Sequence, residues 1–306
     1  MTSTAPSTPA APLGAVAAVV AAALAEDAPW GDVTSESLLP ADARARAELR
    51  AREPGVLAGG AAAREAFAQA AALTGGTAAV HDLLPDGTRF AAGDVLARVE
   101  GTALAVLRAE RVALNLLQHL SGVATLTARF VEEVTGTGTR IADTRKTTPG
   151  LRALERAAVR AGGGRNHRWS LSDAVLVKDN HLAVLLAEGL DVTAALRAAR
   201  ERVPHTTVVE VEVDRLDQLD AVLAAGVDVV LLDNFALADL AEGVRRARAA
   251  GALVEASGGV RLDTVRAIAA TGVDVVSVGA LTQNARTLDL GLDVEVLVGA
   301  RTGTGS

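Results

Sequence analysis

The chain has 306 residues, half of them hydrophobic, with a formal net charge of −7 and no cysteine. This length suffices for a large domain plus a smaller one, and the lack of cysteine excludes disulfides and thiolate zinc sites. Aromatic residues make up only 2%, and together with the acidic balance this disfavours nucleic-acid and anionic-membrane partners, which favour stacking surfaces or a basic field. We therefore expect a cytoplasmic enzyme.

The N-terminal segment combines a polar stretch with an apolar run. Residues 1–12 are rich in Pro, Ser and Thr, which predicts a disordered extension. Residues 13–25 have the length of a signal-peptide core, but the first basic residue is Arg44, so the charged region that should precede such a core is missing. The run is also too short to span a bilayer, and we interpret it as the first helix.

The next part of the chain predicts an α+β domain over residues 13–115. Its pattern predicts a loop with breakers at Pro29 and Gly31, a half-buried strand over 43–52, a helix over 60–73 and strands near 77–83 and 95–100. Over 103–134 it predicts either one long helix or a helix broken at Ser121-Gly122. The last apolar segment, 288–298, lacks a following helix, so we expect residues 286–306 to return to this N-terminal domain.

Residues 116–285 predict a second α/β domain. Six short, nearly continuous apolar segments alternate with helical patterns and are typical of a parallel sheet covered on both faces: 140–144, 174–179, 207–214, 228–234, 252–259 and 274–280. Polar residues follow each segment, as expected for a barrel whose strand ends converge on one mouth. Six strands predict an open, incomplete TIM-like barrel, and a doubly wound sheet is the alternative.

The stretch 143–181 holds the most concentrated polar chemistry. Only two of the thirty basic residues are lysines, Lys146 and Lys178, and both lie in it. A chain that otherwise uses arginine keeps a compact ammonium where a planar fork does not fit. Gly162–Gly164 permit close backbone approach to a ligand. With Arg145, His167 and Arg168, these residues predict one wall of an anion pocket, suited to a planar acid with two carboxylates.

Two acidic residues end neighbouring strand candidates. Glu212 and Asp233 offer the hard oxygen ligands that Mg²⁺ prefers. Glu210 alternates with Glu212, faces the same side of its strand and is the rival ligand. Asp233 also suits a helix cap, which is the competing interpretation.

Glycine-rich turns follow the last two strand candidates. Ser257-Gly258-Gly259 and Gly279 resemble phosphate cradles, in which backbone N–H groups bind the anion. The last two loops of a barrel are a frequent phosphate site. The remaining histidines, His81, His119, His181 and His205, are interpreted as structural or surface residues.

Motifs along the chain carry a family resemblance: DTRKTTPGLRALERAAVRAGGGRNHR, LSDAVLVKDNH, EVEVD, LLDN, EASGG and VGALT in the second half, with EDAPWGDVTSE, EPGVLAGG and ERVALNLLQHLSGVAT in the first. They resemble the quinolinate phosphoribosyltransferase family over nearly the whole chain after about residue 13. The resemblance implies an α/β-sandwich domain with an open α/β barrel, a homodimer with shared sites, and Mg²⁺. The implied reaction transfers phosphoribose from phosphoribosyl pyrophosphate to quinolinate with loss of CO₂.

The resemblance also implies roles for single residues. Quinolinate would be held by Arg111, Thr144, Arg145, His167, Arg168 and Lys178, and the phosphoribosyl donor by Lys146, Glu212, Asp233, Ser257, Gly258 and Gly279, with Glu212 and Asp233 at the metal. Lys146, Lys178, Glu212 and Asp233 would be the catalytic set. The alternative is a molybdenum-transport-linked homologue that uses the same barrel on another acid.

Overall fold

The computed structural model describes residues 11–297, and these divide into two units, each described by itself. The first unit holds residues 11–126, 148–163 and 285–297; the second holds 127–147 and 164–284. The extension predicted over residues 1–12 lies almost entirely outside the described residues. In the described part of the chain, no helix has both the length and the apolarity to cross a membrane.

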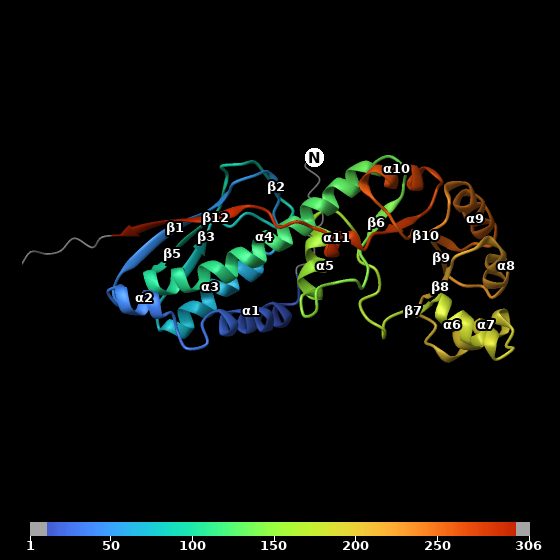
Figure 1. Ribbon diagram of the computed structural model, residues 1–306, viewed down its shortest axis with the longest axis horizontal. Helices are drawn as coiled ribbons and strands as arrows, with labels where there is room; N and C mark the ends of the chain where they lie inside the picture. Colours follow the sequence, from blue (N-terminus) through green and yellow to red (C-terminus); the bar gives the residue numbers. More distant parts are fainter. Residues whose placement is uncertain (1–10, 298–306) are drawn as a thin grey trace, which may run out of the picture. The chain divides into compact units, whose positions relative to one another are not determined.

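The first unit is a layer of helices on an antiparallel sheet (Figure 1). Its elements are α1 (Leu13–Asp27), α2 (Val33–Leu38), β1 (Arg44–Ala51), β2 (Gly55–Val56), α3 (Gly60–Thr74), β3 (Ala78–His81), β4 (Arg89–Phe90), β5 (Val95–Thr102), most of α4 (Ala103–Glu133), α5 (Arg152–Ala161) and β12 (Leu290–Leu297). The main sheet has the order β12-β1-β5-β3, and β2 pairs with β4. In β1, Ala45, Ala47 and Leu49 are buried and alternate with more exposed residues, so the predicted half-buried strand is confirmed.

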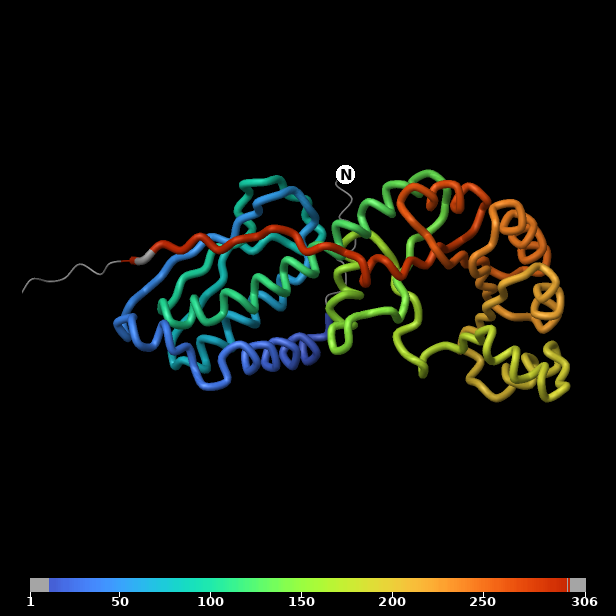
Figure 2. The backbone as a smooth tube through the Cα atoms, in the orientation of Figure 1, coloured from blue at the N-terminus to red at the C-terminus, as the bar shows by residue number. Residues whose placement is uncertain are grey.

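The C-terminal segment returns to this sheet, as the sequence predicts. β12 runs antiparallel to β1, from Arg44 opposite Leu297 to Ala51 opposite Leu290, and Figure 2 shows the two segments side by side. Glu53 fixes the start of the return: it accepts a hydrogen bond from the backbone N–H of Asp289 (2.8 Å) and forms an ion pair with Arg286.

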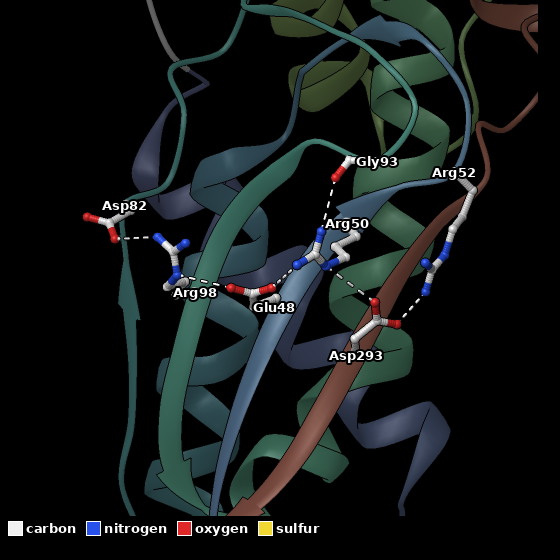
Figure 3. Close-up of polar contacts among 7 residues, drawn as sticks. All are labelled: Glu48, Arg50, Arg52, Asp82, Gly93, Arg98 and Asp293. Carbon is white, nitrogen blue, oxygen red and sulfur yellow. Dashed lines mark hydrogen bonds and ion pairs between the residues drawn. The ribbon is translucent and has the colours of Figure 1, made fainter.

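The outer face of this sheet carries a ladder of charged side chains. We define the charge ladder as Asp82, Arg98, Glu48, Arg50, Asp293 and Arg52, in the order in which they contact one another (Figure 3). Positive and negative groups alternate across all four strands. Cross-strand pairs of opposite charge stabilise a sheet, and this row fills the solvent side of the strands whose other side forms the core.

The structure decides between the two forms of the helix over 103–134 and corrects the predicted loop. The helix over 103–134 is unbroken, because Ser121 and Gly122 serve close packing: Ser121 Oγ accepts the backbone N–H of Ala58 (3.1 Å), and a Cβ on Gly122 would lie 2.0 Å from the carbonyl oxygen of Arg286. The loop with Pro29 and Gly31 contains a short helix, α2, capped by Asp32, which accepts from the N–H of Ser35 (3.0 Å).

The unit boundaries also differ from the predicted boundary at residues 115 and 116. The first unit continues to residue 126 inside α4 and takes in residues 148–163, because α5 packs against α1. Gly162 and Gly163 belong to the first unit, where they end α5, and Gly163 has a φ of 88°. The predicted approach of this glycine run to a ligand is wrong: the run is the turn that closes a helix.

The second unit is an open, all-parallel barrel, as predicted. Its strands are β6 (Arg140–Ala142), β7 (Val175–Val177), β8 (Val209–Val213), β9 (Val229–Asp233), β10 (Leu253–Ser257) and β11 (Val275–Ser277), and its helices are the last turns of α4 with α6 (Asp179–Ala187), α7 (Val192–Arg202), α8 (Leu216–Ala224), α9 (Leu237–Ala249), α10 (Leu262–Ala270) and α11 (Ala280–Gln283). The order β6-β11-β10-β9-β8-β7 leaves β6 and β7 as the two edges. Arg165 forms a parallel bridge with Ala142, so the chain after α5 lies along the β6 edge.

Candidate active site

A cavity of about 500 Å³ opens at the carboxyl ends of the barrel strands in the second unit. All six strands or the turns after them contribute to its lining, as expected for the mouth of a parallel barrel. It is lined by Thr144, Arg145, Lys146, His167, Arg168, Leu176, Lys178, Glu212, Leu231, Asp233, Glu255, Ser257, Gly258, Gly259, Val260, Ser277, Val278, Gly279, Ala280, Gln283 and Asn284. Every residue predicted for the site except Arg111 lies in this lining.

The strand register explains why these side chains meet. In the parallel pairing, Glu212 lies opposite Leu231, and Leu231 lies opposite Glu255. Two residues nearer the mouth, Asp233 lies opposite Ser257. Because successive side chains on a strand point to opposite faces, residues two apart share the inner face. The polar residues that end the strands therefore point into one cavity.

Positive charge gathers on one side of the cavity. Lys178 Nζ lies 3.0 Å from Glu212 Oε2, and Arg168 Nη1 donates to the carbonyl of Ala174 (3.2 Å). Burial and the neighbouring Arg145 lower the pKa of Arg168. Within the described residues, the buried Nε of Arg145 has no hydrogen-bond partner, and Lys146 has no acidic partner. This excess of cations favours an anionic ligand.

Asp143 anchors the segment that carries two of the pocket residues. It is fully buried and follows β6; its carboxylate accepts from the backbone N–H of His167 (2.7 Å) and from Asn166 Nδ2 (2.5 Å). The backbone N–H of Asp143 donates to the carbonyl of Arg165 (3.1 Å). His167 and its neighbour Arg168 are thus fixed by backbone contacts at the open edge of the barrel.

The ring of His167 lies between two buried acids. Its Nε2 is 3.1 Å from Glu210 Oε2 and 3.4 Å from Glu255 Oε2, and these acids are 6% and 4% exposed. Although burial opposes charge on the ring, Glu210 and Glu255 raise the pKa of His167 to about 10. Burial also raises the pKa of Glu210, an effect that His167 partly offsets. Nδ1 accepts a hydrogen bond from the backbone N–H of Arg168 (2.8 Å), so both ring nitrogens have partners inside the protein.

The glycines after β10 and β11 give the cavity a backbone-lined side. Gly258 and Gly259 have φ values of 89° and 58°, and a Cβ on Gly258 would lie 2.3 Å from Asn234 Oδ1. A Cβ on Gly279 would lie 3.0 Å from Lys146 Cδ. Only glycine fits these conformations or approaches without displacement, which leaves backbone groups accessible to a ligand. Of the two predicted cradles, the one at Gly279 lies next to Lys146.

Two carboxylates at the mouth meet the requirements of Mg²⁺. Glu212 lines the cavity beside Lys178, and Asp233 accepts from Ser257 Oγ and from Asn234 Nδ2 (2.7 Å), which orients it. Mg²⁺ binds through one or two carboxylates plus substrate phosphates and water, so an all-oxygen pair facing the glycine turns fits it. Glu210, the rival ligand, contacts His167 beneath the cavity.

Sequence reasoning missed residues that act through other residues. Asp143 and Glu255 carry polar contacts that hold His167, and Thr282 Oγ1 donates to the carbonyl of Lys146 (2.6 Å). Asn234 has a φ of 57° and supports the glycine turn through its N–H bond to Ser257 O (3.0 Å). Glu255 could have been found from the sequence, because it is an acidic residue inside an otherwise apolar strand. His181 has a structural role, as predicted: its Nδ1 accepts from the N–H of Lys178 (2.9 Å).

Arg111 lies in the first unit, on the exposed side of α4. Its predicted role at the cavity stays a prediction, as do the ligand assignments of the other site residues.

Comparisons with known proteins agree with this architecture. Residues 32–121 match the model of the quinolinate phosphoribosyl transferase N-terminal domain, and residues 123–293 match the C-terminal domain. A Mycobacterium leprae protein, nicotinate-nucleotide pyrophosphorylase (carboxylating), is 44% identical over 275 residues, which cover 89% of this chain and 94% of that protein.

Solved structures give the same result. The nicotinate-nucleotide pyrophosphorylase of Francisella tularensis superposes with a TM-score of 0.85 at 36% identity, covering 94% of this chain and 99% of that one. The enzyme of the same name from Ehrlichia chaffeensis gives 0.83 at 35% identity, covering 91% and 98%. With two family domains that together span most of the chain, this chain belongs to the quinolinate phosphoribosyl transferase family.

Proposed function

We propose that this protein is a carboxylating nicotinate-nucleotide pyrophosphorylase, which makes nicotinate mononucleotide for NAD biosynthesis. It transfers phosphoribose from phosphoribosyl pyrophosphate to quinolinate and releases pyrophosphate and CO₂. The observation that carries the proposal is one cavity that combines four cations, three carboxylates and two glycine turns. The family assignment supports the same reaction, and no observation favours the molybdenum-transport-linked alternative.

On the donor side, the phosphoribosyl pyrophosphate occupies the glycine turns. Backbone groups of Gly258 and Gly279 and the ammonium of Lys146 bind its phosphates, and Ser257 adds a hydroxyl. Glu212 and Asp233 would hold Mg²⁺, which would neutralise charge on the departing pyrophosphate. Because breaking this bond makes the leaving group negative, Lys146 stabilises the transition state more than the bound substrate.

On the acceptor side, quinolinate lies against the cationic wall. Arg145, Arg168 and Lys178 pair with its two carboxylates, and Thr144 and Arg111 complete the contacts. The ring nitrogen attacks the anomeric carbon as pyrophosphate leaves, and so becomes cationic. Loss of the 2-carboxylate as CO₂ leaves an electron pair on the adjacent carbon, stabilised by that cation until it takes a proton. Positioning supplies much of the remaining rate enhancement.

We also propose a cytoplasmic homodimer in which Arg111 of one subunit serves the cavity of the other. The support is that Arg111 belongs to the first unit while every other predicted contact belongs to the second. A two-fold dimer would then hold two composite sites.

The test is product analysis with purified protein, Mg²⁺, phosphoribosyl pyrophosphate and quinolinate labelled in its 2-carboxylate. Labelled CO₂ and nicotinate mononucleotide should appear in equal amounts, and both should disappear when Mg²⁺ is chelated. Nicotinate replaces quinolinate in a parallel reaction. Product from nicotinate but none from quinolinate would refute the assignment.

A further inference from the structure

His167 lies in the wall of the cavity but uses both ring nitrogens inside the protein. Nε2 lies between Glu210 and Glu255, and Nδ1 accepts the backbone N–H of Arg168 at 2.8 Å. The backbone N–H of His167 is bound by Asp143 at 2.7 Å. The ring is therefore held by Glu210 of β8 and Glu255 of β10, and the backbone of His167 by Asp143, which follows β6. Through Nδ1, His167 connects these residues to Arg168.

The contact at Nδ1 decides where the ring proton lies. A nitrogen that accepts a hydrogen bond carries no proton, so a neutral His167 has its proton on Nε2, facing the two carboxylates. A second proton on Nδ1 would break the bond to Arg168. The two acids hold the proton on Nε2 but also favour a charged ring, whereas the N–H of Arg168 at Nδ1 opposes the second proton.

The same contact argues against a metal ion in this cluster. His167, Glu210 and Glu255 have ligand atoms within 4.8 Å of one another, which by spacing alone suits a metal site. A histidine that binds metal through Nε2 carries its proton on Nδ1 and donates it to a neighbour. Here Nδ1 faces a donor, the N–H of Arg168, so hydrogen bonding explains the arrangement and metal ligation does not.

We infer that Glu210 and Glu255 are positioning residues, which hold the His167 ring so that its Nδ1 fixes the Arg168 backbone and sets the acid-binding wall of the cavity. Arg168 is held at two points, by its N–H to His167 and by Nη1 to the carbonyl of Ala174 (3.2 Å). A guanidinium pairs with a carboxylate through two parallel bonds, so a small rotation of its backbone costs binding. The inference rests on the proposed function for its ligand, quinolinate.

The first experiment reads the ring directly and needs no substrate. Nitrogen-15 NMR of histidine-labelled protein distinguishes protonated from acceptor ring nitrogens, and the chain has only five histidines. The His167→Gln variant assigns the signal. Although the two acids favour the charged ring, we expect a proton on Nε2 and none on Nδ1, where the N–H of Arg168 donates, and the same pattern when Zn²⁺ is added. A proton on Nδ1, or a His167 signal that responds to metal first, would overturn the inference.

The second experiment separates positioning from general structure. Glu255→Leu removes the acceptor, and we expect the KM for quinolinate to rise by roughly 10–100-fold, with the KM for phosphoribosyl pyrophosphate little changed. Glu255→Gln keeps an acceptor oxygen and should stay within about threefold of the wild type. The same pair of changes at Glu210 should give the same pattern. Equal losses for both substrates, or no recovery with Gln, would contradict positioning.

A matched control lies in the first unit. Glu155 is also fully buried and contacts a histidine, His119 Nε2, at 2.8 Å. Glu155→Gln should change thermal stability but leave the KM for quinolinate unaltered. If Glu255→Leu does not fold, the Gln variants and the NMR signal still decide the question. If the wild type makes no product from quinolinate, the proposed function fails while the ring measurement still stands.

Discussion

The charge ladder of the first unit and the cavity of the second use the same residue types in opposite ways. In the ladder every charge meets its opposite: Arg98 lies 3.0 Å from Asp82 and 3.2 Å from Glu48, and Arg50 bridges Glu48 and Asp293 (Figure 3). In the cavity, Arg145 and Lys146 lack such acidic partners among the described residues. Side chains that satisfy one another stabilise a fold, whereas side chains left with unused donors are available to a ligand.

Lysine usage also differs between the two regions, although Lys178 is paired with Glu212. All positive charges in the ladder are arginines, which hold carboxylates through a planar fork, while both lysines of the chain line the cavity. The comparison teaches that counting charges does not locate a binding site. The informative feature is a cation whose neighbours do not neutralise it.

The strongest way to break this comparison is to exchange the cation type in each region. We expect Lys146→Arg and Lys178→Arg to lower kcat/KM by roughly 10²–10³-fold, because a wide guanidinium cannot replace a point charge at the leaving group or beside Glu212. Steady-state kinetics with circular dichroism as a folding check measures this. The control, Arg98→Lys in the ladder, should keep full activity. Near-normal turnover of either cavity variant would remove the argument.

The two carboxylates at the mouth extend the comparison between the ladder and the cavity to acidic side chains. Glu212→Gln and Asp233→Asn should weaken binding of phosphoribosyl pyrophosphate with Mg²⁺ by roughly 10–100-fold, and binding of quinolinate much less. Calorimetric titration of each ligand measures both. Glu210→Gln serves as the comparison variant, since its carboxylate contacts His167 and not the mouth. A donor defect in Glu210→Gln alone would assign the metal to the other acid of the strand.

Arg111 tests whether the first unit also contributes a cation to catalysis. Arg111→Ala and Lys178→Ala subunits should each be inactive alone. If Arg111 serves the partner subunit, random 1:1 mixing makes half of the dimers mixed, each with one intact site of two, and restores about a quarter of wild-type activity. Co-expression with two affinity tags and native mass spectrometry confirms the mixed dimers. Mixed dimers without activity would place Arg111 in its own subunit's site or outside the reaction.

The ladder itself should matter for stability and not for activity. Glu48→Gln removes the charge between Arg98 and Arg50, and we expect about 0.5–1 kcal/mol less stability in urea unfolding, with the loss shrinking as salt is added. Kinetics should match the wild type. A changed KM would mean that this face of the sheet takes part in substrate binding and that the ladder does not serve stability alone.

Local patterns predicted the fold because the burial of each strand determines the order of apolar and polar residues along it. Alternation identified β1, and apolar runs identified all six barrel strands, since burial on one or both faces leaves a direct trace in the sequence. Local patterns could not decide whether the helix over 103–134 breaks at Ser121-Gly122. There the small residues serve a contact with Arg286, which is distant in the chain and leaves no local pattern.

The candidate site follows the same rule. Residues at strand ends could be gathered at one mouth from the barrel topology alone. The partners beneath them could not, because the contact of His167 with Glu255 depends on which strands are neighbours and on their register. The ring proton depends on one backbone N–H, that of Arg168. The contacts of the His167 ring therefore require the three-dimensional structure, whereas the cations of the cavity could be located from the sequence.

A second effect on stability alone concerns the ion pair that fixes the returning segment. Hydrogen bonds from Arg286 and from the backbone N–H of Asp289 lower the pKa of Glu53 to about 2. A carboxyl whose pKa is lowered in the folded state stabilises it above the unfolded pKa of about 4.5, and this contribution is lost as the pH falls toward 2. Because Arg286 is largely exposed, solvent screening limits the contribution to about 1 kcal/mol. Glu53→Gln should therefore be less stable than the wild type at pH 7, and the two urea unfolding curves should converge as the pH falls from about 4.5 toward 2. A difference that stayed constant over this range would show that the amide, and not the charge, accounts for the loss.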